Sequence, residues 1–120
     1  MSATTQEVKE IMSQSTGTEG YHKLSLVPIN CTDGVKNIAL KADAFWLVDA
    51  IGSYQTEQKI KAEEFQVWTL EVQGSTAVLF MTDGNSNHRK VEQLIGYTDF
   101  PEGEWKFYLT NDVLMVTSEY

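Results

Sequence analysis

The stretch Asp43-Ala-Phe-Trp-Leu-Val-Asp-Ala-Ile-Gly-Ser-Tyr-Gln55 decides how this sequence folds. Its spacing predicts a helix that is apolar nearly all round apart from Asp49. A helix of this kind belongs in the middle of a domain rather than on its surface. A carboxylate inside it must be paired, protonated or placed at an opening to water. We therefore expect Trp46 and Ile51 to be buried, and Asp49 to be either a structural acid that joins helix to sheet or an anion in a pocket.

Two amphipathic helices are predicted before this stretch. Residues 5–14 keep apolar side chains at helical spacing, and Thr4 or Thr5 can cap the first turn. Residues 32–42 do the same, with Thr32 as the N-cap. The segment between these helices is predicted to hold a short strand around Leu24, Leu26 and Ile29.

The second half of the chain changes to an alternation of apolar and polar residues, which is typical of half-buried strands. Short turns separate the runs, and Asp83-Gly-Asn-Ser-Asn87 is the clearest hairpin loop. The pattern predicts an α+β domain over residues 1–120, in which N-terminal helices pack on one face of a four- to five-stranded antiparallel meander sheet. Residues 1–16 either join this domain or form a separate N-terminal helix. The predicted strands lie around residues 68–72, 77–81, 91–95, 105–109 and 113–116.

The charge of the chain restricts the kind of partner it can bind. The net charge of the 120 residues is −8, and residues 62–120 contain ten acids and three bases. An acidic surface repels phosphate backbones, so direct binding of nucleic acid is disfavoured. The same surface suits a partner protein that presents a basic surface. A plainer interpretation is that the acids keep a small protein soluble.

The composition also restricts the compartment and the chemistry. The N-terminus lacks the basic and apolar regions of a signal peptide, and no apolar run approaches the roughly 20 residues that cross a bilayer. We expect a cytoplasmic protein without membrane contact. The single cysteine, Cys31, excludes an internal disulfide and a cysteine-based zinc site. Because His22 lies nearby in sequence, a Cys31 nucleophile is conceivable, but a buried inert thiol is the commoner outcome.

No other pattern in the sequence indicates a reaction or a bound cofactor. His22 and His88 lack the spacing of metal ligands. Asp83 and Asn85 resemble the start of a calcium loop, but Leu94 stands where that loop needs a glutamate, so a hairpin turn explains them. We expect no metal, no cofactor and no enzymatic activity.

An ordered set of short motifs resembles a small uncharacterised family of proteins found in bacteria, on plasmids and in phages. The resemblance spans roughly residues 17–120 and leaves residues 1–16 outside. It implies a domain type and a mobile-element setting, but no chemistry. The motifs are Gly17-Thr-Glu-Gly-Tyr21, Thr32-Asp-Gly-Val35, Ala44–Ile51 with Ser53-Tyr-Gln55, Glu64-Phe-Gln-Val-Trp68, Thr82-Asp-Gly-Asn85, Tyr97-Thr-Asp-Phe-Pro101 and Ser118-Glu-Tyr120.

The turn after the third strand of the second half is the best candidate for a partner-binding surface. Asp99, Glu102 and Glu104 cluster there around Phe100, with Trp105 next in sequence. Aromatic anchors ringed by charge suit a protein interface. The alternative is that Phe100 and Trp105 belong to the core and the acids only solvate the turn.

These observations predict a non-enzymatic, acidic protein-binding module. Given the mobile-element setting, its expected role is that of an anti-defence inhibitor, similar in action to an anti-CRISPR protein, which occludes a basic nucleic-acid-binding site of a host protein. One alternative is a small-molecule-binding domain or unfamiliar enzyme, with a pocket formed by Asp49, Tyr54 and His22. A structural or regulatory homodimer is a third hypothesis.

Overall fold

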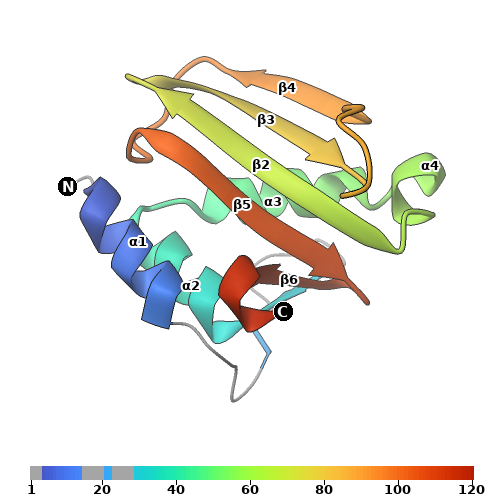
Figure 1. Ribbon diagram of the computed structural model, residues 1–120, viewed down its shortest axis with the longest axis horizontal. Helices are drawn as coiled ribbons and strands as arrows, with labels where there is room; N and C mark the ends of the chain where they lie inside the picture. The colour runs from blue at the N-terminus through green and yellow to red at the C-terminus, as the bar shows by residue number, and fades with distance from the viewer. Residues whose placement is uncertain (1–3, 15–20, 23–28) are drawn as a thin grey trace.

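Figure 1 shows the fold in a computed structural model, which describes residues 4–14, 21–22 and 29–120. The described helices are α1 (Thr5–Gln14), α2 (Asp33–Lys41), α3 (Phe45–Tyr54), the short α4 (Gln58–Lys61) and the C-terminal 3-10 turn η1 (Thr117–Glu119). The strands are β1 (Asn30–Cys31), β2 (Phe65–Gln73), β3 (Thr76–Thr82), β4 (Val91–Ile95), β5 (Gly103–Thr110) and β6 (Val113–Val116).

The six strands form one sheet in the order β1-β6-β5-β2-β3-β4. The α+β class and a mostly antiparallel sheet are confirmed, but the predicted count of four or five strands and the continuous meander are wrong. After β4 the chain returns across the end of the sheet, and β5 pairs with β2 on the side away from β3. In this register Trp68 lies opposite Phe107, and Leu70 lies opposite Trp105. The central strands thereby carry the largest buried side chains. The two-residue β1 joins β6 in parallel, which the purely antiparallel prediction also missed.

The predicted helix starts are confirmed by their caps. Thr4 and Glu7 form a reciprocal capping box, in which each side chain accepts a hydrogen bond from the other residue's backbone N–H. Thr32 caps α2 by accepting from the N–H of Val35. Asp43 has a φ of 52° and forms the bend between α2 and α3. Of the strand predicted near residue 24, Leu24 and Leu26 lie outside the described residues.

The central helix prediction is half right, because α3 lies in an outer layer rather than in the middle of the domain. Figure 1 shows α3 packed behind β2 and β5. Ile51 is completely buried, as predicted, but Trp46 is half-buried and Asp49 is exposed. A domain of one sheet and one helix layer leaves each helix a solvent-facing stripe. In α3 this stripe contains Asp49 and Ser53, one turn apart.

A buried pair of amides joins α3 to β2, and nothing in the sequence pattern indicated it. The side chains of Gln55 and Gln66 exchange two hydrogen bonds of 2.9 Å. Gln66 also donates to the Ile60 carbonyl and accepts from the Trp68 indole N–H at 2.8 Å. These partners satisfy two amides that are less than 5% exposed, so the network fixes the end of α3 and the turn of α4 against the sheet.

Candidate functional site: the open face of the sheet

Alternate side chains of the strands point away from the described helices and form a second face of the sheet, which we call the open face. The cross-strand register arranges these side chains in rows perpendicular to the strands. Row 1 contains Glu104, Glu71, Val78 and Leu94. Row 2 contains Lys106, Thr69, Phe80 and Glu92. Row 3 contains Met115, Tyr108, Val67 and Thr82.

Row 1 is acidic at one end and apolar at the other. Glu104 on β5 lies directly opposite Glu71 on β2, and Glu71 lies opposite Val78 on β3. Val78 in turn lies opposite Leu94 on β4, whose side chain is 81% exposed. Like charges directly opposite each other destabilise an antiparallel pair, so the two carboxylates favour a cation close to both.

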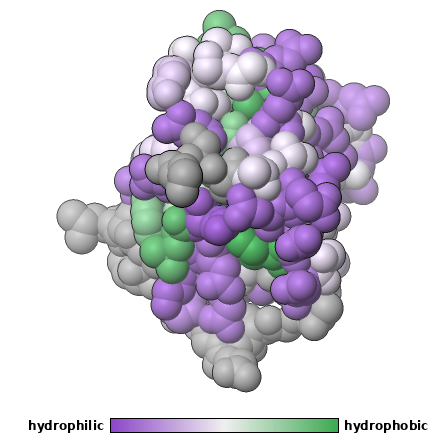
Figure 2. Space-filling view, turned by 90° about the vertical axis from the view of Figure 1, so that its left-hand side faces the viewer, coloured by the Kyte–Doolittle hydropathy of each residue, from purple (hydrophilic) through white to green (hydrophobic). Residues whose placement is uncertain are grey.

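A cavity of about 560 Å³ lies along row 1. The ends of four strands meet at it, at the left of Figure 1. Its lining combines the row 1 side chains with Val72, Ala77 and Ile95 and with two glycines, Gly96 and Gly103. Figure 2 shows that hydrophilic side chains cover most of this end of the molecule and that hydrophobic ones show only in small patches.

Two basic side chains partly neutralise the acids of rows 1 and 2. Arg89 contacts both Glu71, at 3.2 Å, and Glu92, and its guanidinium stacks 3.7 Å from the centre of the Phe80 ring. Lys106 lies 3.7 Å from Glu104. All of these charged groups are partly exposed, so each pair contributes little to stability. Three carboxylates against two cations leave the two rows with one excess negative charge.

An aromatic cluster occupies the other end of the open face. The rings of Phe65, Tyr108 and Tyr120 lie within 5.0 to 5.4 Å of one another, measured between ring centroids. Phe65 and Tyr108 are half-buried, and Tyr120 is 75% exposed. The open face therefore carries an accessible apolar patch at this end and charged side chains at the other.

The structure divides the predicted partner-binding residues between the core and the surface. Phe100 and Trp105 are at most 3% exposed and pack on each other, so the prediction that Phe100 contacts a partner is wrong. Asp99, Glu102 and Glu104 remain exposed. Trp105 lies on the covered face of β5, opposite the buried Leu70. Its indole N–H donates to the carbonyl of Pro101 and closes the loop on the core.

Each of the three acids occupies a defined position in or beside the loop. The Tyr97 hydroxyl donates to Asp99 at 2.7 Å, and this hydrogen bond raises the pKa of Tyr97. Glu102 accepts from the N–H of Gly74 in the β2–β3 turn, which places it beside the cavity. Glu104 lines the cavity itself.

The pocket predicted from Asp49, Tyr54 and His22 is wrong, because these residues do not meet. Tyr54 donates to Gln93 on β4, at one edge of the sheet. His22 pairs with Cys31 of β1, at the opposite edge, five strand spacings or roughly 24 Å away. Asp49 lies in solvent on α3 and therefore has no need of the internal partners expected for a structural acid.

The nucleophile hypothesis for Cys31 also fails on geometry and protonation. The Cys31 side chain is completely buried, and desolvation raises the pKa of its thiol to about 12. The imidazole of His22 instead contacts Asp33 at 2.6 Å. The N-terminus of α2 is occupied by Glu119, which accepts from the Thr32 hydroxyl and from the N–H of Gly34.

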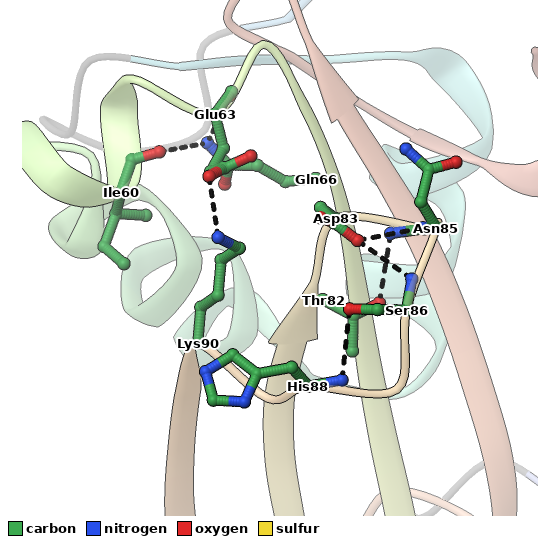
Figure 3. A network of polar contacts seen from close by, with 10 residues as sticks. Ile60, Glu63, Gln66, Thr82, Asp83, Asn85, Ser86, His88 and Lys90 are labelled. Atoms are coloured by element: carbon green, nitrogen blue, oxygen red, sulfur yellow. Dashed lines mark hydrogen bonds and ion pairs between the residues drawn. The ribbon is translucent and has the colours of Figure 1, made fainter.

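Figure 3 shows the polar network around the 83–87 hairpin loop, where a turn rather than a calcium site was predicted. The Asp83 carboxylate accepts from the N–H groups of Asn85 and Ser86, and these bonds lower its pKa. Lys90 pairs with Glu63 at 2.8 Å and ties this loop to the start of β2. Across the described residues, no group of three or more acidic, histidine or cysteine side chains is arranged to hold a metal ion.

Sequence reasoning missed Glu71, Val78 and Leu94 as site residues. The alternation of apolar and polar residues contained the signal, because each of the three is out of phase with the buried residues of its strand. What the sequence lacked was the strand order that brings them into one row with Glu104.

Comparison with known proteins gives one match. A family model described as a family of unknown function (DUF6876) matches residues 6–120. The chain belongs to this family. The match includes residues 6–16, which the motif resemblance left outside, so most of α1 is part of the family's domain. No curated protein and no solved structure is significantly similar to the chain. Of the helices that the structure describes, none is long and apolar enough to cross a membrane.

Proposed function

We propose that this protein is a non-enzymatic protein-binding module that contacts its partner with the open face of the sheet. The observation that carries the proposal is the composition of this face, where the accessible aromatic cluster and row 3 adjoin the charged side chains of rows 1 and 2. Protein interfaces usually combine buried apolar contacts with adjoining polar and charged ones, and this face offers an apolar end beside a charged end. The sheet and its turns hold these side chains in place, so little ordering is needed on binding.

The charge distribution favours a partner with a basic surface. The chain carries a net charge of −8, the exposed Glu104 lines the cavity of row 1, and the exposed Asp99 and Glu102 lie in the loop before it. Their loop is held by buried Phe100 and Trp105, by the hydrogen bond from Gly74 to Glu102, and by one from Thr5 of α1 to the Glu102 carbonyl. A fixed set of acids of this kind increases the rate of encounter with a positively charged partner.

A narrower form of the proposal gives the partner a role. A small acidic protein that occludes the basic nucleic-acid-binding site of a host protein would act as an anti-defence inhibitor of a phage or other mobile element, in the host cytoplasm. The size and charge of the chain support this form. A binding role is also favoured because the two side chains considered for catalysis are occupied. The Cys31 thiol is buried, and His22 contacts Asp33.

The test is capture of a partner from host lysate with three versions of the protein. The open-face variant Val67→Ser/Phe80→Ser removes apolar surface from rows 2 and 3. The matched control Leu40→Ser removes an equally apolar side chain, 58% exposed, from α2 in the helix layer. We expect one partner to be retained by the wild type and the control, to be lost from the open-face variant, and to elute as salt rises.

The charge part of the proposal is tested with the captured partner. Changing Asp99, Glu102 and Glu104 to Lys should slow association while the fold is kept, because all three acids are exposed. The measurement is the association rate at two ionic strengths. An unchanged rate, or salt-independent capture by all variants, would contradict a basic partner bound at this face.

A further inference from the structure

We propose that the row 1 cavity binds an extended peptide segment of the partner in which a lysine or arginine stands two residues from an aliphatic residue. This inference deepens the proposed function and rests on it for the identity of the partner as a protein. It assigns the apolar end of the row to the aliphatic side chain and the acidic end to the cation.

The dimensions of the cavity match this occupant. Row 1 crosses four neighbouring strands, so about 14 Å separates its first and last residues, and about 10 Å separates Leu94 from Glu71. In an extended peptide, side chains two residues apart lie on the same side at a separation of about 7 Å. When an aliphatic side chain of the peptide contacts Val78 and Leu94, a basic side chain two residues away therefore lies within reach of Glu71 and Glu104.

The charges determine the sign of the ligand. Glu71 and Glu104 lie side by side, and Glu102 is held close by through Gly74. The internal cations lie on the row 2 side, since Arg89 stacks over Phe80 and Lys106 is itself a row 2 residue. With Glu92 included, four carboxylates face two cations around this end of the sheet. The excess is negative along the acidic end of row 1, so an anionic or neutral polar segment would fit less well.

The apolar half supplies the second element of recognition. Leu94 is 81% exposed on the edge strand β4, and Val78 lies directly opposite it and lines the same cavity. An exposed leucine beside a concave apolar lining gains from burial by a ligand side chain. A purely ionic ligand, such as a free polyamine, would leave this half uncovered.

The experiment titrates isotopically labelled full-length protein with three capped probe peptides and follows the backbone amide NMR signals. The probes are acetyl-Ser-Leu-Ser-Lys-Ser-amide, its analogue with glutamate in place of lysine, and its analogue with serine in place of leucine. We expect the first probe to shift the amides of row 1 and to bind roughly three- to tenfold more tightly than either analogue, as one or two exposed ion pairs or one small apolar contact would give.

Variants locate the effect. Glu71→Gln/Glu104→Gln should reduce binding of the lysine probe to that of its glutamate analogue. Leu94→Ser should reduce binding of the same probe to that of the analogue with serine in place of leucine. Asp49→Asn removes a negative charge from the helix layer and should bind the probe as the wild type does. The amide spectrum of each variant shows directly that it is folded.

Three results would overturn the inference. The lysine and glutamate probes could bind equally, the shifts could lie outside row 1, or the row 1 signals could respond to protein concentration without peptide, which would make a second copy of the chain the occupant. If partner capture still depends on Val67 and Phe80, these results leave the proposed function standing. Conversely, probe binding at row 1 without open-face capture would support the site and contradict the wider proposal.

Discussion

The two faces of the sheet differ in what their side chains do, although the same strands supply both. On the covered face of β2, Trp68 and Leu70 are completely buried beneath the helices. On the open face of the same strand, Val67 and Glu71 are only half-buried, although Thr69 between them is 2% exposed. One residue of register therefore separates a side chain sealed beneath the helices from one that a partner can reach at Val67 or Glu71. Substitutions on the two faces should accordingly affect different measurements.

The largest difference is expected where α3 seals the covered face. Ile51→Ala should lower the free energy of unfolding by about 2–5 kcal/mol, because it leaves a cavity at a fully buried position. The matched change Val67→Ala on the open face should cost no more than about 1 kcal/mol. Urea denaturation of the two variants and the wild type measures both losses. Similar losses for the two variants would show that the open face is buried in solution and would break the comparison.

A smaller loss is expected from the buried amides. Gln66→Ala should cost about 1–3 kcal/mol, because it leaves the side-chain oxygen of Gln55 and the indole N–H of Trp68 without the partner that Gln66 provides. Gln73→Ala, at the exposed end of the same strand, serves as the control and should change stability by less than about 0.5 kcal/mol. Equal midpoints for the two variants in denaturant would mean that water replaces the lost hydrogen bonds of Gln66.

The sequence was sufficient for whatever depends on neighbouring residues. The caps at Thr4 and Thr32 and the alternation in the second half predicted the helix starts and the strands, because capping and pleating are local. It was insufficient for strand order, which depends on contacts such as Leu70 with Trp105, 35 positions apart. A meander has the shortest connections, whereas the observed order places the buried Trp68, Trp105 and Phe107 on the two central strands.

The candidate site was predicted in part for the same reason. The acids Asp99, Glu102 and Glu104 were correctly expected at the surface, since turns are solvated. Phe100 was misplaced because an aromatic residue in a turn can point either way, and the Trp105 ring draws it into the core. The Asp49 prediction treated an apolar helix as central, whereas a single helix layer exposes one stripe of it.

The pH dependence of stability should come in part from the helix layer. The hydrogen-bonded ion pair with Lys41, followed by the Thr4 capping bonds, lowers the pKa of Glu7 from 4.5 to about 2. A carboxyl group with a lowered folded-state pKa stabilises the fold above pH 4.5 and loses that contribution as the pH falls toward 2. Glu7→Gln should therefore be less stable than the wild type at pH 7, and the gap should narrow below pH 4.5.

Urea midpoints of both proteins across this pH range provide the measurement. Lys41→Gln should reproduce the narrowing, because it removes the same ion pair from the other side. A gap that stays constant from neutral to acidic pH would contradict a lowered pKa of Glu7 in the folded protein, since both the ion pair and the cap bond to Thr4 involve the ionised carboxylate.

The smallest effect on stability is expected at the position most important for the proposed peptide site. Leu94 is 81% exposed on an edge strand, so Leu94→Ala removes little surface that folding has buried. Its free energy of unfolding should stay within about 0.5 kcal/mol of the wild type. Leu79→Ala on the neighbouring strand β3 is the contrast, because that leucine is completely buried on the covered face and its loss should cost about 2–5 kcal/mol.

A destabilisation of Leu94→Ala that grows with protein concentration would mean that a second copy of the chain buries this leucine. A concentration-independent loss of the size expected for Leu79 would place Leu94 within the fold itself and would remove the open face as a binding surface at this edge.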